Sequence, residues 1–122
     1  PLFDHVVREL APLGLAYIHV IEGATGGPRE VEGRPFDYAA LKAAYRAAGG
    51  KGAWMVNNGY DADMAAHAVA SGHADMVAFG KLYIANPDLV ERLREKAPLN
   101  PWDQHTFYGG GEHGYTDYPK LA

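Results

Sequence analysis

The stretch that decides the fold runs from Ala74 to Arg92 and reads A-D-M-V-A-F-G-K-L-Y-I-A-N-P-D-L-V-E-R. Within it, the apolar run from Met76 to Phe79 has the length of a buried strand and no helical periodicity. The run ends at Gly80, where the backbone can approach a ligand closely, and Lys81 follows at once. A flexible cation beside two exposed backbone N–H groups at the end of a strand suits the binding of a phosphate.

A helix is expected soon after this strand. Asn86 is predicted to be its N-cap, Pro87 its first helical residue and Asp88 a first-turn acid that complements the helix dipole. The helical pattern continues to Lys96, so the sequence predicts a helix over residues 87–96.

The rest of the chain alternates between helical and strand patterns. Apolar residues at helical spacing, closed by glycine or proline, predict helices over residues 3–12, 36–48 and 62–70. Short apolar runs predict strands over residues 15–21 and 53–56. The glycine-rich segment 23–34 is predicted to be a loop, and residues 97–122 lack periodicity and are expected to form an irregular tail.

The alternation of helices and apolar strands predicts an α/β fold. Short connections and nearly continuous apolar strands indicate a parallel sheet with right-handed crossovers. Three such strands cannot close a barrel, which needs eight, and an open sheet of three would expose two apolar edges. The chain also runs from Pro1 directly into an amphipathic pattern, as expected for the middle of a domain.

Composition narrows the classes of function. The chain has 122 residues, of which 48% are hydrophobic, and this is enough for an ordinary core. Its net charge of −4 and its scattered Lys and Arg residues argue against binding to nucleic acid or to an anionic membrane surface. Cysteine is absent and the six histidines lack zinc-site spacing, so no metal site is predicted. With no leader pattern and no apolar run near twenty residues, a cytoplasmic location is expected.

Three further motifs follow the first stretch in a fixed order: Leu99-Asn100-Pro101, the run T-F-Y-G-G-G at 106–111, and the run H-G-Y-T-D-Y-P at 113–119. Together with residues 74–92 they resemble the C-terminal signature of the flavin-dependent old yellow enzyme family, the ene-reductases. The resemblance implies an eight-stranded TIM (β/α)8 barrel. The chain would supply its C-terminal part, about three β/α units plus the tail, from the fifth helix through the eighth. Residues 1–122 would then be one segment of a single FMN-binding barrel domain, not an independent domain.

The resemblance also implies a cofactor site. Backbone N–H groups near Asn58 and Gly59, and near Gly80 and Lys81, would cradle the phosphate of flavin mononucleotide (FMN) in the loops after the seventh and eighth strands. Taken alone, Asn58-Gly59 is better explained as a common turn, and an arbitrary lysine is more often a solvated cation. Many relatives carry arginine where this chain has Lys81. Lysine keeps the positive charge but cannot bind two phosphate oxygens at once, as a guanidinium does.

Tyr108 is the substrate-binding residue that the resemblance implies, lying over the flavin face, whereas the sequence alone favours a packed aromatic of the tail. Tyr115 and Tyr118 are expected to pack the tail against the barrel. Glu22 and Glu30 flank the loop after a strand, an acceptable place for a catalytic carboxylate, but the resemblance gives them no role. The catalytic residues of the family belong to earlier strands, so none is expected in this segment.

The activity that the resemblance implies is reduction of activated C=C bonds, as in enones, with NAD(P)H as the reductant and FMN as the cofactor. The expected partner is the N-terminal portion of the same enzyme, present as a separate chain or segment of a split, nicked or circularly permuted barrel. Two alternatives stay open: a non-catalytic module that binds a phosphorylated ligand or flavin, and a structural fragment that assembles with its own kind.

Overall fold

The computed structural model describes residues 1–24, 27–33 and 35–122. These residues form two compact units, Pro1–Ala78 and Phe79–Ala122. Part of the predicted loop over residues 23–34, namely Thr25, Gly26 and Arg34, lies outside the described residues. No helix in the described ranges is both long and apolar enough to cross a membrane.

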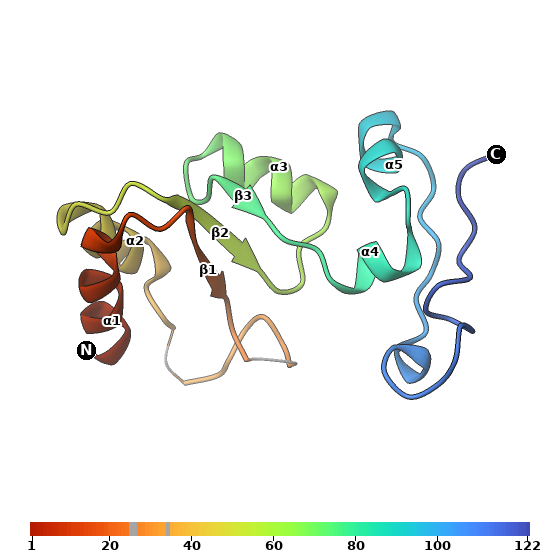
Figure 1. Cartoon of the computed structure of the whole chain (residues 1–122), viewed down its shortest axis with the longest axis horizontal. Coiled ribbons are helices and arrows are strands. Elements are labelled where there is room, and N and C mark those ends of the chain that lie inside the picture. The colour runs from red at the N-terminus through yellow and green to blue at the C-terminus, as the bar shows by residue number, and fades with distance from the viewer. Residues whose placement is uncertain (25–26, 34) are drawn as a thin grey trace. The chain divides into compact units, whose positions relative to one another are not determined.

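The first unit is a parallel sheet with helical connections, as predicted. Its elements in chain order are α1 (Leu2–Leu10), a 3₁₀ turn (Ala11–Leu13), β1 (Tyr17–Ile21), α2 (Tyr38–Ala47), β2 (Ala53–Asn57), α3 (Ala62–Ala70) and β3 (Met76–Val77). The strands that the structure describes pair in parallel in the order β1-β2-β3, with β2 in the middle (Figure 1). The carboxyl ends of the strands therefore lie at one edge of the sheet.

Local signals explain the helix boundaries of this unit. Asp37 caps α2 by accepting a hydrogen bond from Ala40 N–H at 2.8 Å, and Asp61 caps α3 in the same way through Met64 N–H at 2.8 Å. Just beyond the end of α2, Gly49 adopts φ 93°, a left-handed conformation that glycine reaches without strain. The predicted helices over 36–48 and 62–70 are confirmed, although Phe36 lies outside α2.

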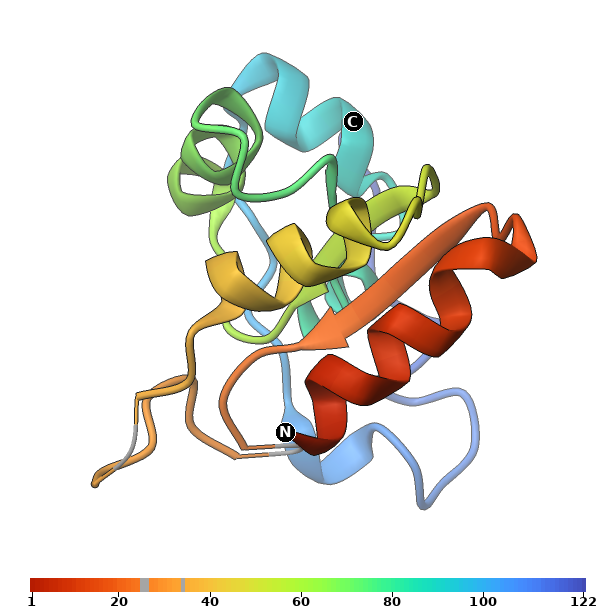
Figure 2. The same cartoon turned by 90° about the vertical axis from the view of Figure 1, so that its left-hand side faces the viewer.

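The two faces of the sheet differ in burial. Ile18, Trp54 and Val56 lie on the covered face, and the Trp54 and Tyr45 rings lie with centroids 5.7 Å apart. Helices α1 and α2 pack beside each other in this layer (Figure 2). On the other face, Tyr17 and Ile21 of β1 are 52% and 44% exposed. This sheet is thus packed on one side and leaves apolar side chains uncovered on the other.

Strand β3 is shorter than predicted. The sequence favoured residues 76–79, whereas the strand spans Met76–Val77, and one further ladder bond runs from Ala78 N–H to Val56 O at 2.9 Å. Since β3 is an edge strand of the sheet, it forms ladder hydrogen bonds on one side only. Fewer of its residues are therefore held in strand conformation.

The second unit contains α4 (Lys81–Ala85), α5 (Leu89–Glu95) and a 3₁₀ turn (Gln104–Thr106), followed by an irregular segment (Figure 1). Helix α4 was not predicted from the sequence, which placed Lys81 in a loop. The prediction of a helix over 87–96 with Asn86 as N-cap is also wrong in its first turn, because α5 begins at Leu89 and Asn86 follows the end of α4.

Hydrogen bonds of buried side-chain amides explain why Asn86 does not cap α5. Its Nδ2 donates to Leu82 O at 2.9 Å, and its Oδ1 accepts from Asn100 N–H at 2.7 Å. Asn100 Nδ2 in turn donates to Ala85 O at 2.9 Å and to Pro119 O at 2.8 Å. A fully buried Asn86 thus ties the irregular segment to α4, and this long-range partner outweighs a local cap.

A buried ion pair anchors the end of the chain. Arg92 Nε donates to Asp88 Oδ1 at 2.8 Å, and the guanidinium also reaches Pro98 O at 2.6 Å and Pro119 O at 2.9 Å. Leu121 N–H donates to Asp88 Oδ2 at 2.7 Å. Burial by itself would raise the pKa of Asp88, but the Leu121 N–H and the Arg92 guanidinium outweigh it and lower the pKa.

This pKa shift gives an acid-sensitive anchor. Because the pKa of Asp88 is lowered on folding, its contribution to stability is present above the unfolded pKa of about 3.9 and is lost as the pH falls below it. We expect hydrogen exchange of residues 98–122, corrected for intrinsic rates, to increase below that pH. In the Asp88→Asn variant, the amides of residues 98–122 should exchange fast already at neutral pH, and their exchange rates should change little on acidification. An equal acid response in both proteins would contradict this assignment.

Candidate cofactor-binding site

The turn after β2 has an unusual backbone. Asn58 adopts φ 101° and Gly59 adopts φ 68°, so two successive residues lie in the left-handed region. For asparagine this conformation is uncommon, although Asn tolerates it better than most residues. Within the described parts of the chain, the N–H groups of Asn58 and Gly59 donate to no protein acceptor. Successive free amides in a turn form a concavity suited to an anion.

The side chain of Asn58 is engaged within the protein. Its Nδ2 donates to Glu22 O at 2.6 Å and lies 3.4 Å from both Ala24 O and Gly27 O. The carbonyl oxygen of Asn58 accepts from Arg29 Nη1 at 2.9 Å. Of the hydrogen-bond donors of Asn58, the backbone N–H is therefore the one that these contacts leave available to a ligand.

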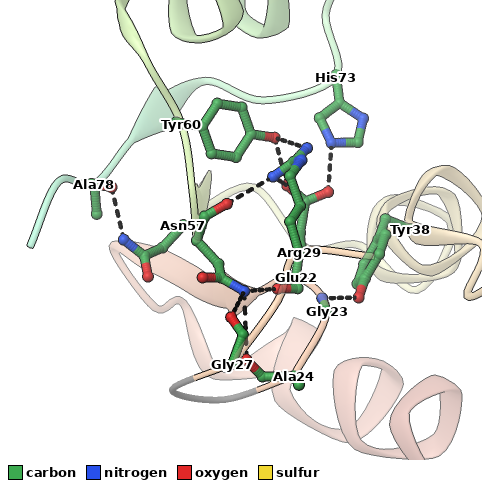
Figure 3. A network of polar contacts seen from close by, with 11 residues as sticks. Glu22, Gly23, Ala24, Gly27, Arg29, Tyr38, Asn57, Tyr60, His73 and Ala78 are labelled. Carbon is green, nitrogen blue, oxygen red and sulfur yellow. Dashed lines mark hydrogen bonds and ion pairs between the residues drawn. The ribbon is translucent and has the colours of Figure 1, made fainter. Parts of the chain in front are cut away.

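Glu22 lies at the centre of a buried polar cluster beside this turn (Figure 3). Its side chain is 4% exposed, and its Oε1 accepts from Arg29 Nη1 at 3.2 Å and from the Tyr60 hydroxyl. Glu22 Oε2 lies 3.0 Å from His73 Nε2. Arg29 also donates to the Tyr60 hydroxyl at 3.0 Å and stacks over the Tyr60 ring, 4.1 Å from its centroid. Both carboxylate oxygens thus have partners, as a buried charge requires.

The cluster shifts the pKa values of two of its members. Burial raises the pKa of Tyr60, and the hydrogen bond to Glu22 raises it further against the opposing effect of Arg29. Burial alone would lower the pKa of Arg29, but the Tyr60 hydroxyl and the Glu22 charge outweigh it and raise the pKa. Tyr60 is therefore a neutral donor and Arg29 a cation at neutral pH.

Gly80 and Lys81 lie at the start of α4 in the second unit, where Gly80 is the N-cap and Lys81 the first residue. Gly80 has φ −93°, and a Cβ added there would have nothing within 4 Å among the described residues. Its own chain therefore does not require a glycine at this position. Lys81 is exposed.

Tyr108 and its neighbours lie in the irregular segment. Phe107 is buried, whereas Tyr108 is 89% exposed. Residues 107–112 bend without a positive φ at Gly109, Gly110 or Gly111. The Tyr108 ring meets the Phe107 ring edge-on, with centroids 6.0 Å apart, and most of Tyr108 stays exposed.

Sequence reasoning missed the cluster around Glu22. Glu22 was considered but given no role, and Arg29, Tyr60 and His73 were not connected with it. The signal available was weak: a glutamate directly after an apolar strand and an aromatic residue directly after Asn58-Gly59. The six histidines were predicted not to form a metal site, and the described residues contain no group of three or more His, Cys, Asp or Glu side chains placed for a metal.

Comparison with known proteins connects this geometry to a family. Residues 2–100 match the profile of the NADH:flavin oxidoreductase / NADH oxidase family. A relative from Oryza sativa subsp. japonica, provisionally named 12-oxophytodienoate reductase 10, is 47% identical over 118 residues, which are 95% of this chain and 37% of the relative.

Solved structures agree with the sequence comparison. The old yellow enzyme from Trypanosoma cruzi matches with a TM-score of 0.84 and 34% identity, over 99% of this chain and 30% of that enzyme. Morphinone reductase matches with a TM-score of 0.79 and 40% identity, over 98% of this chain and 30% of that protein. The chain thus spans about a third of the length of these relatives. It belongs to the NADH:flavin oxidoreductase / NADH oxidase family, and its fold is part of the α/β barrel of the old yellow enzymes.

Proposed function

We propose that this chain is the C-terminal segment of an FMN-dependent ene-reductase barrel and supplies the FMN phosphate site and one wall of the substrate pocket. The observation that carries the proposal is the left-handed Asn58-Gly59 turn at the carboxyl end of β2, whose N–H groups donate to no acceptor among the described residues. In (β/α) barrels, ligands bind at the carboxyl ends of the strands, and phosphate is bound by the loops after the last two.

The residues fit a phosphate chemically. Asn58 and Gly59 offer backbone donors, and a glycine at position 80 lets the backbone approach an anion closely. Lys81 adds an exposed positive charge directly after Gly80. Gly80 has open space and a negative φ, so neither packing nor backbone strain among the described residues requires a glycine there.

When bound, FMN would supply the chemistry of hydride transfer between NAD(P)H and an activated alkene. This segment anchors the cofactor phosphate and borders the substrate, while the residue that protonates the α-carbon comes from the N-terminal part of the barrel. A nicotinamide reductant is supported by a relative, because a solved morphinone reductase variant holds tetrahydroNAD.

Two other functions remain as alternatives. A non-catalytic module would bind flavin or another phosphorylated ligand through the same amides without turnover. A structural fragment would assemble with other pieces and bind neither. Family membership favours the enzyme, and the open turn argues only against a fragment that binds no phosphate.

The test combines this chain with the N-terminal part of the barrel. The assembled protein should bind FMN, lose its flavin absorbance when NADPH is added without oxygen, and regain it when 2-cyclohexen-1-one is added. Bound FMN without bleaching would favour the binding module, and absence of bound FMN would favour the structural fragment.

Tyr108 is proposed to shape the alkene pocket. Tyr108 is 89% exposed, which suits a residue that borders a ligand. Tyr108→Ala should change the relative kcat/KM for bulky and small enones by about tenfold, since one pocket contact discriminates by roughly 1–3 kcal/mol. Flavin content should stay near that of the parent. The measurement is reoxidation of prereduced enzyme by a series of enones in stopped flow.

Two further variants separate the possible roles of Tyr108. Tyr108→Phe should behave as the parent if only the ring borders the pocket, and should slow alkene reduction if the hydroxyl donates to the substrate. Tyr115→Ala removes another exposed tyrosine of the same segment and serves as the control. If every variant matches the parent on each enone, Tyr108 does not border the substrate.

A further inference from the structure

We infer that Glu22, Arg29 and Tyr60 are positioning residues that set the direction of the amides of the Asn58-Gly59 turn. The inference rests on the proposed function, because it concerns the phosphate-binding turn of that site. It assigns a role to a polar cluster, centred on the buried Glu22, that lies outside the sequence motifs.

Peptide planarity carries the first step of the argument. The carbonyl of one residue and the N–H of the next belong to a single rigid plane and point in opposite directions. Arg29 Nη1 binds Asn58 O at 2.9 Å, so it fixes the plane that contains the Gly59 N–H. Glu22 N–H binds Asn57 O at 3.0 Å and fixes the plane that contains the Asn58 N–H. In each of these two peptides, the protein holds the carbonyl oxygen. The N–H on the other side of the peptide, which is the candidate phosphate donor, is oriented as a result.

The second step concerns the strain in this turn. Asn58 is a non-glycine residue at φ 101°, a conformation that persists only when surrounding contacts determine it. Its Nδ2 is bound to Glu22 O at 2.6 Å, which holds the side chain while Arg29 holds the carbonyl. Without these contacts the peptide would be free to flip and would turn the Gly59 N–H away.

The third step explains why the cluster contains a buried carboxylate. Glu22 Oε1 and the Tyr60 hydroxyl bind different nitrogens of Arg29, at 3.2 Å and 3.0 Å. These contacts orient the planar guanidinium so that it reaches Asn58 O. His73 binds the other oxygen of Glu22 at 3.0 Å. The charge of Arg29 is thereby matched within the cluster, and its function is to hold the turn and not to bind the phosphate itself.

The experiment compares FMN with riboflavin, which lacks the phosphate, in the complete barrel. Arg29→Met should weaken FMN binding by about tenfold, as expected for the net loss of one or two hydrogen bonds, and leave riboflavin binding unchanged. The matched control is Arg46→Met. Arg46 also makes three hydrogen bonds in the first unit, to Gly50 O, Gly52 O and Asp75, and its side chain is 35% exposed compared with 32% for Arg29.

A second variant separates positioning from direct binding. Glu22→Gln keeps the shape of the side chain but removes the charge that holds Arg29. If Arg29 positions the turn, Glu22→Gln should also lower the FMN-to-riboflavin affinity ratio. If Arg29 binds the phosphate directly, removal of the competing carboxylate should keep or raise that ratio, and the inference would be overturned.

The possible failures are distinguishable. If the parent barrel binds FMN no better than riboflavin, the proposed phosphate site itself fails. If the parent prefers FMN and Arg29→Met keeps that preference, only the positioning role fails. If Arg46→Met lowers the ratio as much as Arg29→Met, the effect is one of general stability, and this also overturns the inference.

Discussion

Purified alone, the 122-residue chain is expected to self-associate, because its sheet has one uncovered face and two edge strands. Tyr17, Ile21 and Met76 of the edge strands are between 38% and 52% exposed, and Leu2 and Phe3 of α1 are more exposed still. Parallel strands with open backbone edges and uncovered apolar side chains are templates for association with further chains.

Addition of the N-terminal strands of the barrel should abolish this behaviour. We expect light scattering to show oligomers or aggregates for the chain alone and one defined particle, with the summed mass of the parts, for the mixture. As a control, N-terminal strands from an unrelated barrel should not rescue the chain. A monomeric chain that unfolds cooperatively by itself would show that residues 1–122 are an independent domain and not a barrel segment.

Lys81→Ala is expected to weaken FMN binding in the assembled barrel by about 1–3 kcal/mol, the range for a charge-assisted hydrogen bond to an anion. Lys81→Arg should bind FMN at least as well as the parent, since a guanidinium grips two phosphate oxygens. Lys51→Ala is the control, because Lys51 is an exposed lysine that precedes β2 and so lies away from its carboxyl end. The measurement is quenching of flavin fluorescence on titration.

Gly80→Ala extends this test to the backbone. Since the added Cβ meets nothing within 4 Å of the described residues and φ is negative, the substitution should leave thermal stability nearly unchanged. Weaker FMN binding without loss of stability would support close approach of the backbone to the phosphate. Unchanged affinity in both Lys81→Ala and Gly80→Ala would contradict the roles proposed for these two residues.

The sequence predicted the regular part of the fold well. Alternating helical and strand patterns predicted a parallel sheet with helical connections, and the structure shows that sheet with the strand order β1-β2-β3. The helices and strands depend on residues close in the chain, which is why the periodicity of apolar residues detects them.

Errors arose where distant residues decide the structure. Asn86 looked like an N-cap, but Asn100, fourteen positions later, binds its side chain instead. The Glu22 cluster joins residues that lie up to fifty-one positions apart, and no local pattern connects Glu22 with His73. The cofactor residues were predicted from family resemblance and not from the residues alone, because Asn-Gly pairs are common turns.

The most direct test of the central proposal is the ratio of FMN to riboflavin affinity in the assembled barrel. If this segment binds the cofactor through its phosphate, FMN should bind more tightly than riboflavin by at least about tenfold, or roughly 1.4 kcal/mol. Lys81→Ala should reduce that ratio. Equal affinity for the two flavins in the parent barrel would contradict the proposal that this segment binds the cofactor through its phosphate.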